Sequence, residues 1–155
     1  MKIINHELVA KVSAEARQNP RLRSNYNLHQ SDESRCHRLL NAIEPGSYIR
    51  PHRHLDPEKD EAFVLMSGRL GVITFADDGE VVGTVLLSHA SGNLAVDIPH
   101  GAYHTAISLE SGTVFYETKA GPYRQLNENE KVSWAPEESD PQVQVFLRQL
   151  CGLFD

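Results

Sequence analysis

The stretch Gly46-Ser-Tyr-Ile-Arg-Pro-His52-Arg-His54-Leu-Asp-Pro-Glu-Lys-Asp-Glu61-Ala-Phe-Val-Leu-Met-Ser-Gly68 decides how the fold is predicted. Side chains alternate between the two faces of a strand, so the imidazoles of His52 and His54 are expected to point the same way. Glu61 stands directly before an apolar run that is typical of a buried strand. A later motif, Pro99-His-Gly-Ala-Tyr-His104, supplies a third imidazole. This mixed set of nitrogen and oxygen donors suits one divalent transition metal, namely Zn, Fe, Mn or Ni.

The metal interpretation depends on the whole pattern rather than on the His-x-His pair alone. The chain has 8 histidines, so a pair one residue apart can also arise by chance or as exposed strand residues. Glu58 competes with Glu61 for the carboxylate role. We favour Glu61 because it precedes the apolar strand, whereas Glu58 lies in a charged loop where water would solvate it.

From about residue 36 onward the pattern predicts short strands separated by turns. The sequence Asp77-Asp-Gly79 is typical of a hairpin turn, and Glu110-Ser-Gly112 marks another. Many short strands at roughly 8–12-residue spacing favour an all-β sandwich or barrel. The expected strands cover residues 38–43, 62–66, 69–75, 80–87, 94–98, 105–109 and 113–118.

Helices are expected only near the two ends of the chain. Residues 5–18 are predicted to form a short helix with Asn5 as its N-cap. Near the C-terminus, Asp140 is expected to cap a second helix, with Pro141 at its first position and Gly152 just past its end. We therefore predict one domain, with a helix and a polar arm over residues 1–35, a barrel over 36–125 and a helical extension over 126–155.

The composition favours a soluble protein. Of the 155 residues, 40% are apolar and 23% are charged, as in ordinary globular domains. Lys and Arg number 15 against 21 for Asp and Glu, and no basic run occurs, so no nucleic-acid partner is expected. The two cysteines are far apart, and neither a secretory signal nor an apolar stretch of membrane-spanning length is visible. These features predict a cytoplasmic protein without membrane contact.

The two histidine motifs resemble those of the cupin superfamily. The first cupin motif is matched by Gly46, His52, His54, Glu61 and Gly68, although the gap before Glu61 is longer than usual. The second is matched by Pro99, Gly101 and His104, with Ser108 where the motif usually has Asn. The resemblance implies an all-β fold, the cupin double-stranded β-helix or jelly-roll barrel, with one bound metal and short helices at both ends.

A finer resemblance, to the WbuC-family cupin metalloproteins, extends over nearly the whole chain. Some members of that family are encoded near genes for O-antigen and other surface polysaccharides. The resemblance therefore implies a link to polysaccharide biosynthesis, and it suggests a homodimer. The segments that carry it include Arg21-Leu-Arg-Ser-Asn-Tyr-Asn27, Leu39-Leu-Asn-Ala-Ile-Glu-Pro-Gly46, Arg50-Pro-His-Arg-His54, Pro57-Glu-Lys-Asp-Glu61 and Trp134-Ala-Pro-Glu-Glu138.

Further side chains are candidates to bind a substrate or to move a proton. His100 is an even number of residues from His104, so it can point into the pocket and act as the catalytic acid or base, or it can simply be exposed. The polar arm at 21–29 could cross the barrel mouth and donate hydrogen bonds to an anionic or hydroxylated substrate, or it could be a solvated link. Phe63 and Ile73 are expected to wall the site. The candidate substrate-binding residues are Arg23, Asn25, Tyr26, His29, Arg50, Lys59 and Tyr103.

Together these residues predict a metal-dependent enzyme acting on a small polar or carbohydrate-derived metabolite. Open positions on the ion would bind the substrate, as isomerase or lyase chemistry requires. An Fe(II)-dependent dioxygenase can use the same ligands. A non-catalytic cupin could also hold a small molecule without turnover, and the sequence leaves these alternatives open.

Overall fold

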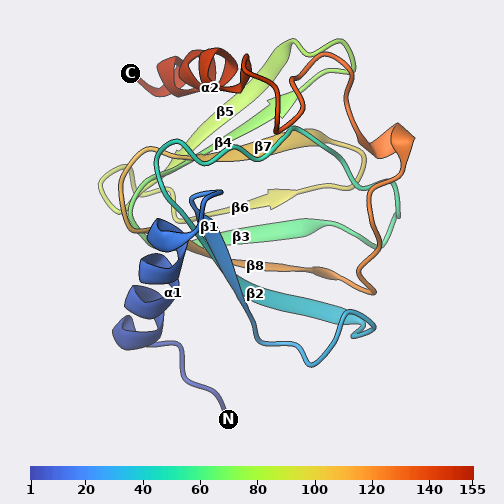
Figure 1. Ribbon diagram of the computed structural model, residues 1–155. Coiled ribbons are helices and arrows are strands. Elements are labelled where there is room, and N and C mark those ends of the chain that lie inside the picture. Colours follow the sequence, from blue (N-terminus) through green and yellow to red (C-terminus); the bar gives the residue numbers. More distant parts are fainter.

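The structure, a computed structural model, describes residues 1–155 and consists mainly of antiparallel strands. Two sheets face each other, and a helix lies on the outer side of each (Figure 1). The eight strands are β1 (Arg23–Asn27), β2 (Cys36–Ile43), β3 (Glu61–Ser67), β4 (Leu70–Phe75), β5 (Val81–Leu87), β6 (Ala95–Ile98), β7 (Tyr103–Ser108) and β8 (Thr113–Ala120). Their order is β1-β2-β8-β3-β6 in the larger sheet and β5-β4-β7 in the smaller one.

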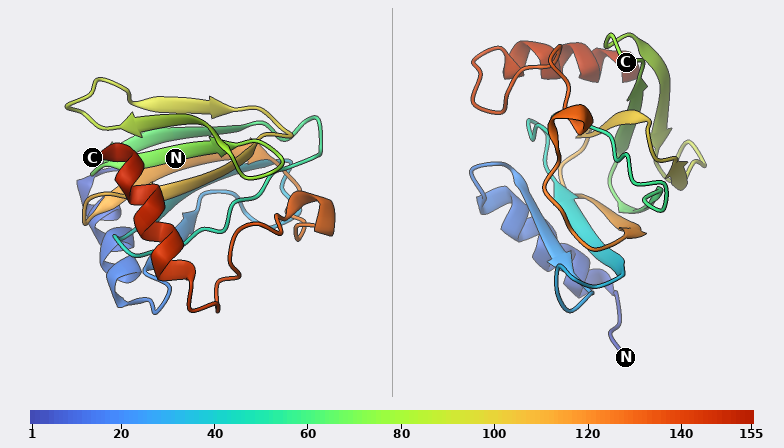
Figure 2. Two further views of the ribbon diagram at one scale, coloured as in Figure 1. Left: turned by 90° about the horizontal axis from the view of Figure 1, so that it is seen from above. Right: turned by 90° about the vertical axis from the view of Figure 1, so that its right-hand side faces the viewer.

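Successive strands cross repeatedly between the two sheets. The chain passes from β3 in the larger sheet to β4 and β5 in the smaller one, returns to β6, crosses to β7 and ends in β8. This alternation makes a double-stranded β-helix, and Figure 2 shows the two sheets curling toward each other. The predicted all-β jelly roll is confirmed, and each expected strand is present within two or three residues of its expected ends.

Helix α1 (His6–Gln18) covers the outer face of the larger sheet. It begins as predicted, because the Asn5 side chain accepts a hydrogen bond of 3.0 Å from the Leu8 backbone N–H. Val12 and Ala16 are fully buried and pack against residues of β2 and β8 that include Leu40. The helix therefore closes a small apolar layer of its own.

Helix α2 (Val143–Cys151) covers the outer face of the smaller sheet, where Leu147 and Leu150 are buried. It begins later than predicted, because Asp140 caps a turn rather than the helix: its carboxylate accepts from the Gln142 N–H. The helix ends at Gly152, as expected. Short 3₁₀ turns lie at η1 (Glu128–Glu130) and η2 (Gly152–Phe154). Neither helix has the length and apolar character needed to cross a bilayer.

The polar arm predicted between helix and barrel is instead an edge strand. Strand β1 pairs antiparallel with β2, and Asn25 lies opposite Asn41. The sequence is too polar to be typical of a strand, but the free edge of β2 offers partners for its backbone N–H and C=O groups. The pairing places one face of β1 over the interior of the barrel.

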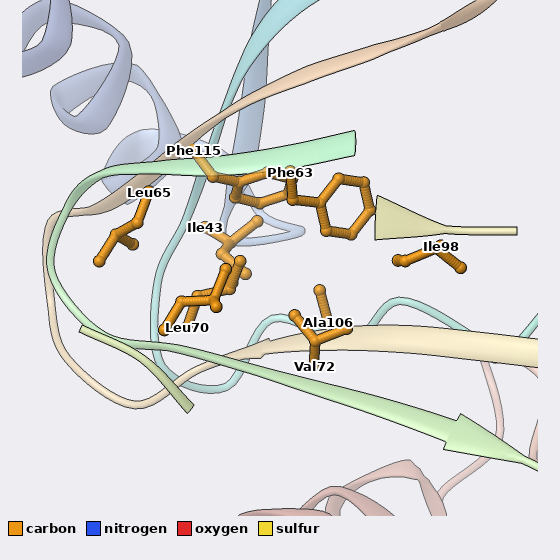
Figure 3. Close-up of a cluster of buried hydrophobic side chains, with 9 residues drawn as sticks. Ile43, Phe63, Leu65, Leu70, Val72, Ile98, Ala106 and Phe115 are labelled. Atoms are coloured by element: carbon orange, nitrogen blue, oxygen red, sulfur yellow. The ribbon is translucent and has the colours of Figure 1, made fainter. Parts of the chain in front are cut away.

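The space between the sheets is filled at one end by a cluster of buried apolar side chains (Figure 3). Leu70 and Leu87 are fully buried there, and Phe63 packs on Phe115 with 4.9 Å between ring centroids. Phe63 faces the site as predicted, at 6.3 Å from the His104 ring. The prediction for Ile73 was wrong, because it alternates with Val72 along β4 and faces α2 rather than the space between the sheets.

Candidate metal centre and cavity

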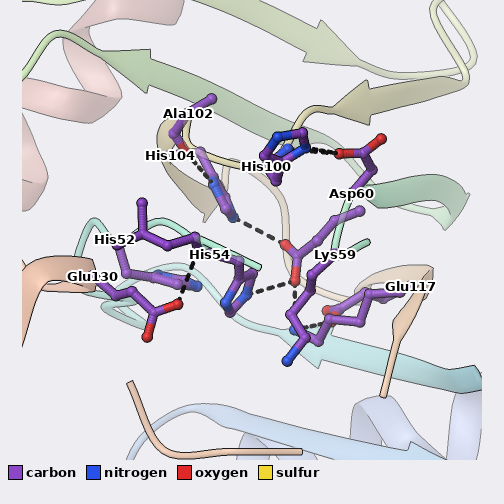
Figure 4. A network of polar contacts seen from close by, with 12 residues as sticks. His52, His54, Lys59, Asp60, His100, Ala102, His104, Glu117 and Glu130 are labelled. Carbon is purple, nitrogen blue, oxygen red and sulfur yellow. Dashed lines mark hydrogen bonds and ion pairs between the residues drawn. The ribbon is translucent and has the colours of Figure 1, made fainter. Parts of the chain in front are cut away.

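The three candidate histidines meet at one end of the barrel. His104 belongs to β7, whereas His52 lies on an extended segment that pairs with it only through an isolated bridge. His52 and His54 are therefore not on a regular strand as predicted, but local alternation still turns both rings to the same side. The His52 ring centroid lies 4.8 Å from that of His104 and 5.3 Å from that of His54. Figure 4 shows the His54 and His104 rings directed at one carboxylate, with the His52 ring beside them.

That carboxylate belongs to Glu61, the first residue of β3. Its Oε2 lies 3.0 Å from His104 Nε2, and its Oε1 lies 2.9 Å from His54 Nε2. The side chain is almost completely buried, with 3% of its surface exposed. Glu58 is exposed in the preceding loop. The structure thus brings Glu61, and not Glu58, to the histidines.

Backbone carbonyls orient two of the imidazoles. His52 Nδ1 lies 3.0 Å from the Arg50 carbonyl, and His104 Nδ1 lies 3.0 Å from the Ala102 carbonyl. A carbonyl only accepts, so each Nδ1 carries the proton and donates it. In a neutral ring Nε2 then presents a lone pair. This is the arrangement in which proteins hold metal-binding histidines.

The lone-pair geometry leaves a position suited to a cation. In neutral His104 the Nε2 lone pair would face a carboxylate oxygen at 3.0 Å, and two lone pairs repel unless a proton or a cation lies between them. His54 Nε2 is close to Glu61 but lacks hydrogen-bond geometry, and it is buried without a hydrogen-bond partner. Both observations fit a bound metal ion or an imidazolium.

The acid–base groups of the site are strongly perturbed. Burial lowers the pKa of His52 to about 3, since the charged imidazolium is disfavoured there. Burial alone raises the pKa of Glu61, but contacts with His104, His54 and Lys119 outweigh it and hold that pKa well below its ordinary value. Burial alone lowers the pKa of Lys119, but the carboxylates of Glu117 and Glu61 outweigh it and raise that pKa. The site therefore holds an ionised carboxylate next to a protonated lysine.

As the side chains stand, they form a hydrogen-bonded cluster and not a finished coordination sphere. No group of three or more His, Cys, Asp or Glu residues has donor atoms arranged to hold one metal ion. The Glu61 carboxylate instead contacts Lys119 through Oε1 and His104 through Oε2. The donor types and the orphaned His54 nitrogen nevertheless fit a divalent ion.

A cavity of about 360 Å³ extends from this cluster along the inner face of the larger sheet. Its deep end includes Lys119 and Glu117, whose side chains lie 2.8 Å apart, and Asn41, which donates to Glu117. Sequence analysis missed these three residues. The signal was present in β8, where alternation puts Phe115, Glu117 and Lys119 on one face, an unusual placement of charge within a strand facing a core.

Of the predicted substrate-binding residues, Arg23 and Asn25 line this cavity. Tyr26 does not, because it alternates to the outer face of β1 and packs near α1. His29 is buried elsewhere and stacks on His37, with ring centroids 4.0 Å apart. Tyr103 is buried under Trp134 and donates to the Asn129 carbonyl. Only the inward face of the polar segment thus reaches the site.

The remaining candidates lie around the cavity rather than in it. Arg50 lines a broad surface hollow along the C-terminal extension, where Glu137 neutralises it. Lys59 lines a small pocket of about 170 Å³ on the other side of His52 and His54. His100 is 44% exposed, and its Nδ1 lies 2.8 Å from Asp60. It does not line the cavity, so its predicted catalytic role stays a prediction.

Similarity to solved structures supports the class of fold. TT1209 from Thermus thermophilus gives a TM-score of 0.55 at 22% identity over 78% of this chain and 98% of that one. KdgF from Halomonas sp. gives 0.53 at 18% identity over 68% and 84%. SPY1581 from Streptococcus pyogenes, a protein of unknown function, gives 0.53 at 12% identity over 79% and 90%. Fold and cavity together define a cupin-type jelly roll.

A family model matches more than half of the chain. Residues 4–87 match the model described as Domain of unknown function (DUF6016). The chain belongs to this family. No curated protein matches it significantly in sequence.

Proposed function

We propose that this protein is a metal-dependent cupin enzyme that acts on a small polar or carbohydrate-derived metabolite by isomerase- or lyase-like chemistry. The observation that carries the proposal is the orientation of the histidines. His52 and His104 donate from Nδ1 to backbone carbonyls, which leaves each Nε2 free, and the Nε2 atoms of His104 and His54 lie 3.0 and 2.9 Å from the Glu61 carboxylate. Beside this cluster lies a polar cavity of small-molecule size.

The metal ligands proposed are His52, His54, Glu61 and His104, with Zn, Fe, Mn or Ni as the ion. A bound divalent ion would polarise a carbonyl or hydroxyl oxygen of the substrate. The buried position of Glu61 and the carbonyl contacts of the histidines keep these side chains in place for that role.

Glu117 is the group that we propose moves a proton. It lies in the cavity, it is buried, and its oxygens contact Lys119 and Asn41. The ammonium of Lys119 would stabilise negative charge that develops on a substrate oxygen, as an enediolate requires. The candidate from the sequence, His100, remains a second proposal, because its exposed pair with Asp60 is outside the cavity lining.

The first experiment is metal analysis by plasma mass spectrometry of tag-free protein. We expect about one transition metal per wild-type chain, and loss of it in Glu61→Gln and His104→Ala. His89→Ala is the matched control, since His89 is an exposed histidine away from the cluster. If wild type binds none after reconstitution with Fe(II), Mn(II), Ni(II) and Zn(II), the metal proposal is wrong.

Deuterium incorporation tests the chemistry. An enzyme that removes a carbon-bound proton should exchange it with D₂O, so NMR of a panel of sugars and sugar acids should show labelling with metal-loaded protein. Glu117→Gln should reduce the rate by roughly 10²–10⁴-fold, whereas His100→Ala should retain it if Glu117 is the base. Oxygen consumption with Fe(II) would indicate the dioxygenase instead, and binding without exchange would indicate a non-catalytic cupin.

Two further proposals rest on the sequence resemblance alone. The likeness to WbuC-family motifs supports a link to surface polysaccharide biosynthesis, and deletion of the gene with analysis of cell-surface glycans would test it. The same resemblance supports a homodimer. Light scattering coupled to size-exclusion chromatography should then give about twice the chain mass.

A further inference from the structure

Positively charged side chains from the segment that leads into β1 line the solvent-exposed end of the cavity, which we call its mouth. Arg21 and Arg23 both line it, together with Asn19. Glu138 reaches across from the C-terminal extension: its oxygens lie 2.6 Å from Arg21 Nε, 2.7 Å from Arg21 Nη2 and 3.0 Å from Arg23 Nη2. A single carboxylate therefore serves two guanidinium groups.

The net charge of the side chains at the mouth differs from that in the interior. Two arginines and one glutamate leave an excess of one positive charge at the mouth. In the interior, Lys119 faces both Glu61 and Glu117, so these three side chains together carry one net negative charge. An anionic group is thus attracted to the arginines at the mouth.

Arg23 has free hydrogen-bond donors that can bind such an anionic group. Its side chain is 19% exposed, and its guanidinium has five N–H groups, of which the structure uses one on Nη1 for the Tyr48 carbonyl and one on Nη2 for Glu138. Burial lowers its pKa, an effect that Glu138 opposes. Glu138 itself is 45% exposed and is held by two contacts from Arg21 and one from Arg23, so a carboxylate or phosphate can replace it in the same geometry.

The cavity lining also contains two amide side chains, those of Asn25 and Asn41. These two amides lie opposite each other in the β1–β2 register. Asn41 donates to Glu117, and Asn25 donates only to Asn27, so both retain free hydrogen-bonding capacity. This part of the cavity suits a chain or ring of hydroxyl groups.

We infer that the ligand is a hydroxylated molecule with a terminal anionic group, carboxylate or phosphate, which binds Arg23 and Arg21 at the mouth. Glu138 is a competing internal anion that must leave when this ligand enters. The substrate class deepens the proposed function and rests on it. The anion-binding site formed by Arg21 and Arg23 requires no metal, so it can be tested independently of metal binding.

The decisive test is calorimetric titration of chelator-treated protein with inorganic phosphate. Glu138→Gln removes the competitor, and phosphate should bind about tenfold more tightly at low salt, with the gain shrinking as salt increases. The matched control is Glu137→Gln, because Glu137 pairs with Arg50 on the neighbouring hollow. Equal affinities for the two variants would overturn the inference. A gain in binding cannot result from misfolding.

A second variant tests the role of Arg23 in anion binding directly. Arg23→Met in the Glu138→Gln background should abolish that gain, and unchanged phosphate affinity would overturn the inference. Titration with acetate in place of phosphate shows whether the site prefers a carboxylate or a phosphate. Glucose 6-phosphate should bind more tightly than phosphate if the amides receive hydroxyl groups, and equal binding would contradict the hydroxylated body. Failure of metal binding would leave each of these results unaffected.

Discussion

The two ends of the space between the sheets have the same backbone frame and opposite chemistry. At one end, Leu70, Leu87 and Phe115 exclude water and hold the sheets together. At the other end, Glu61, His104 and Lys119 are also largely buried, yet they bring charge into the barrel. The apolar end gains free energy from burial, whereas the polar end loses solvation that its internal contacts must replace. Such an arrangement is expected of a site that binds something.

The ring of Phe63 marks the boundary between the two ends. It contacts Phe115 on one side and the His104 imidazole on the other. Because adjacent strands in the larger sheet are in register, the polar positions Glu61, Lys119 and Glu117 lie on the same face and toward the same end. The strand register therefore separates the closed end from the open one.

Removal of the lysine should produce the largest loss of stability. Lys119→Met leaves Glu61 and Glu117 as buried carboxylates without their cation, which should cost about 4 kcal/mol of unfolding free energy at pH 7. The loss should shrink as the pH falls to about 5, because the carboxyls can then be protonated in the folded state. Urea unfolding at both pH values measures it. A loss that does not change with pH would contradict an electrostatic cause.

A cavity at the apolar end should cost slightly less. Leu70→Ala should lower the unfolding free energy by about 3 kcal/mol, because Leu70 is fully buried and its truncation removes apolar contacts and leaves a cavity in the cluster. Unlike the lysine variant, its loss should be independent of pH and should leave phosphate binding at the mouth unchanged. Loss of phosphate affinity in a folded Leu70→Ala protein would show that the two ends are coupled.

The pH dependence of metal-free protein should report on the histidine end. The folded-state pKa of His52 is about 3, below its ordinary value of 6.5, so between these values the unfolded chain binds a proton that the folded chain does not. Stability should therefore fall as the pH decreases from 6.5, by at most about 1.4 kcal/mol per pH unit from this group. His52→Gln should flatten the slope between pH 5 and 6.5, a window above the range where Glu61 titrates. His89→Gln, at an exposed position, should leave it unchanged.

The smallest effect is expected at His100. Its pair with Asp60 is exposed on both sides, so His100→Ala should change the unfolding free energy by less than about 0.5 kcal/mol. Thermal unfolding beside wild type measures this. A loss as large as that of the Leu70 variant would show that the Pro99–His104 turn depends on this pair and would revise the boundary of the site.

The sequence by itself determined an all-β sandwich or barrel, both helices and the group formed by His52, His54, Glu61 and His104, and the cupin resemblance implied the jelly roll. These follow from local rules: alternation along strands, turn residues, caps and motif spacing. Even the choice of Glu61 over Glu58 depended on its position next to an apolar run, and the structure places Glu61 at the histidines.

Only the tertiary structure decided which other polar residues share the cavity. Pairings between distant segments form the strand β1 and bring Glu138 to Arg21. Such pairings also decide that the side chains of Asn41, Glu117 and Lys119 point inward. The tertiary structure also decided which candidate residues lie outside the cavity. Contacts with neighbouring groups hold the side chains of His100, His29 and Tyr103 away from it. Side-chain alternation gives the face of a strand that a residue occupies, but only the assembled sheets decide what lies opposite that face.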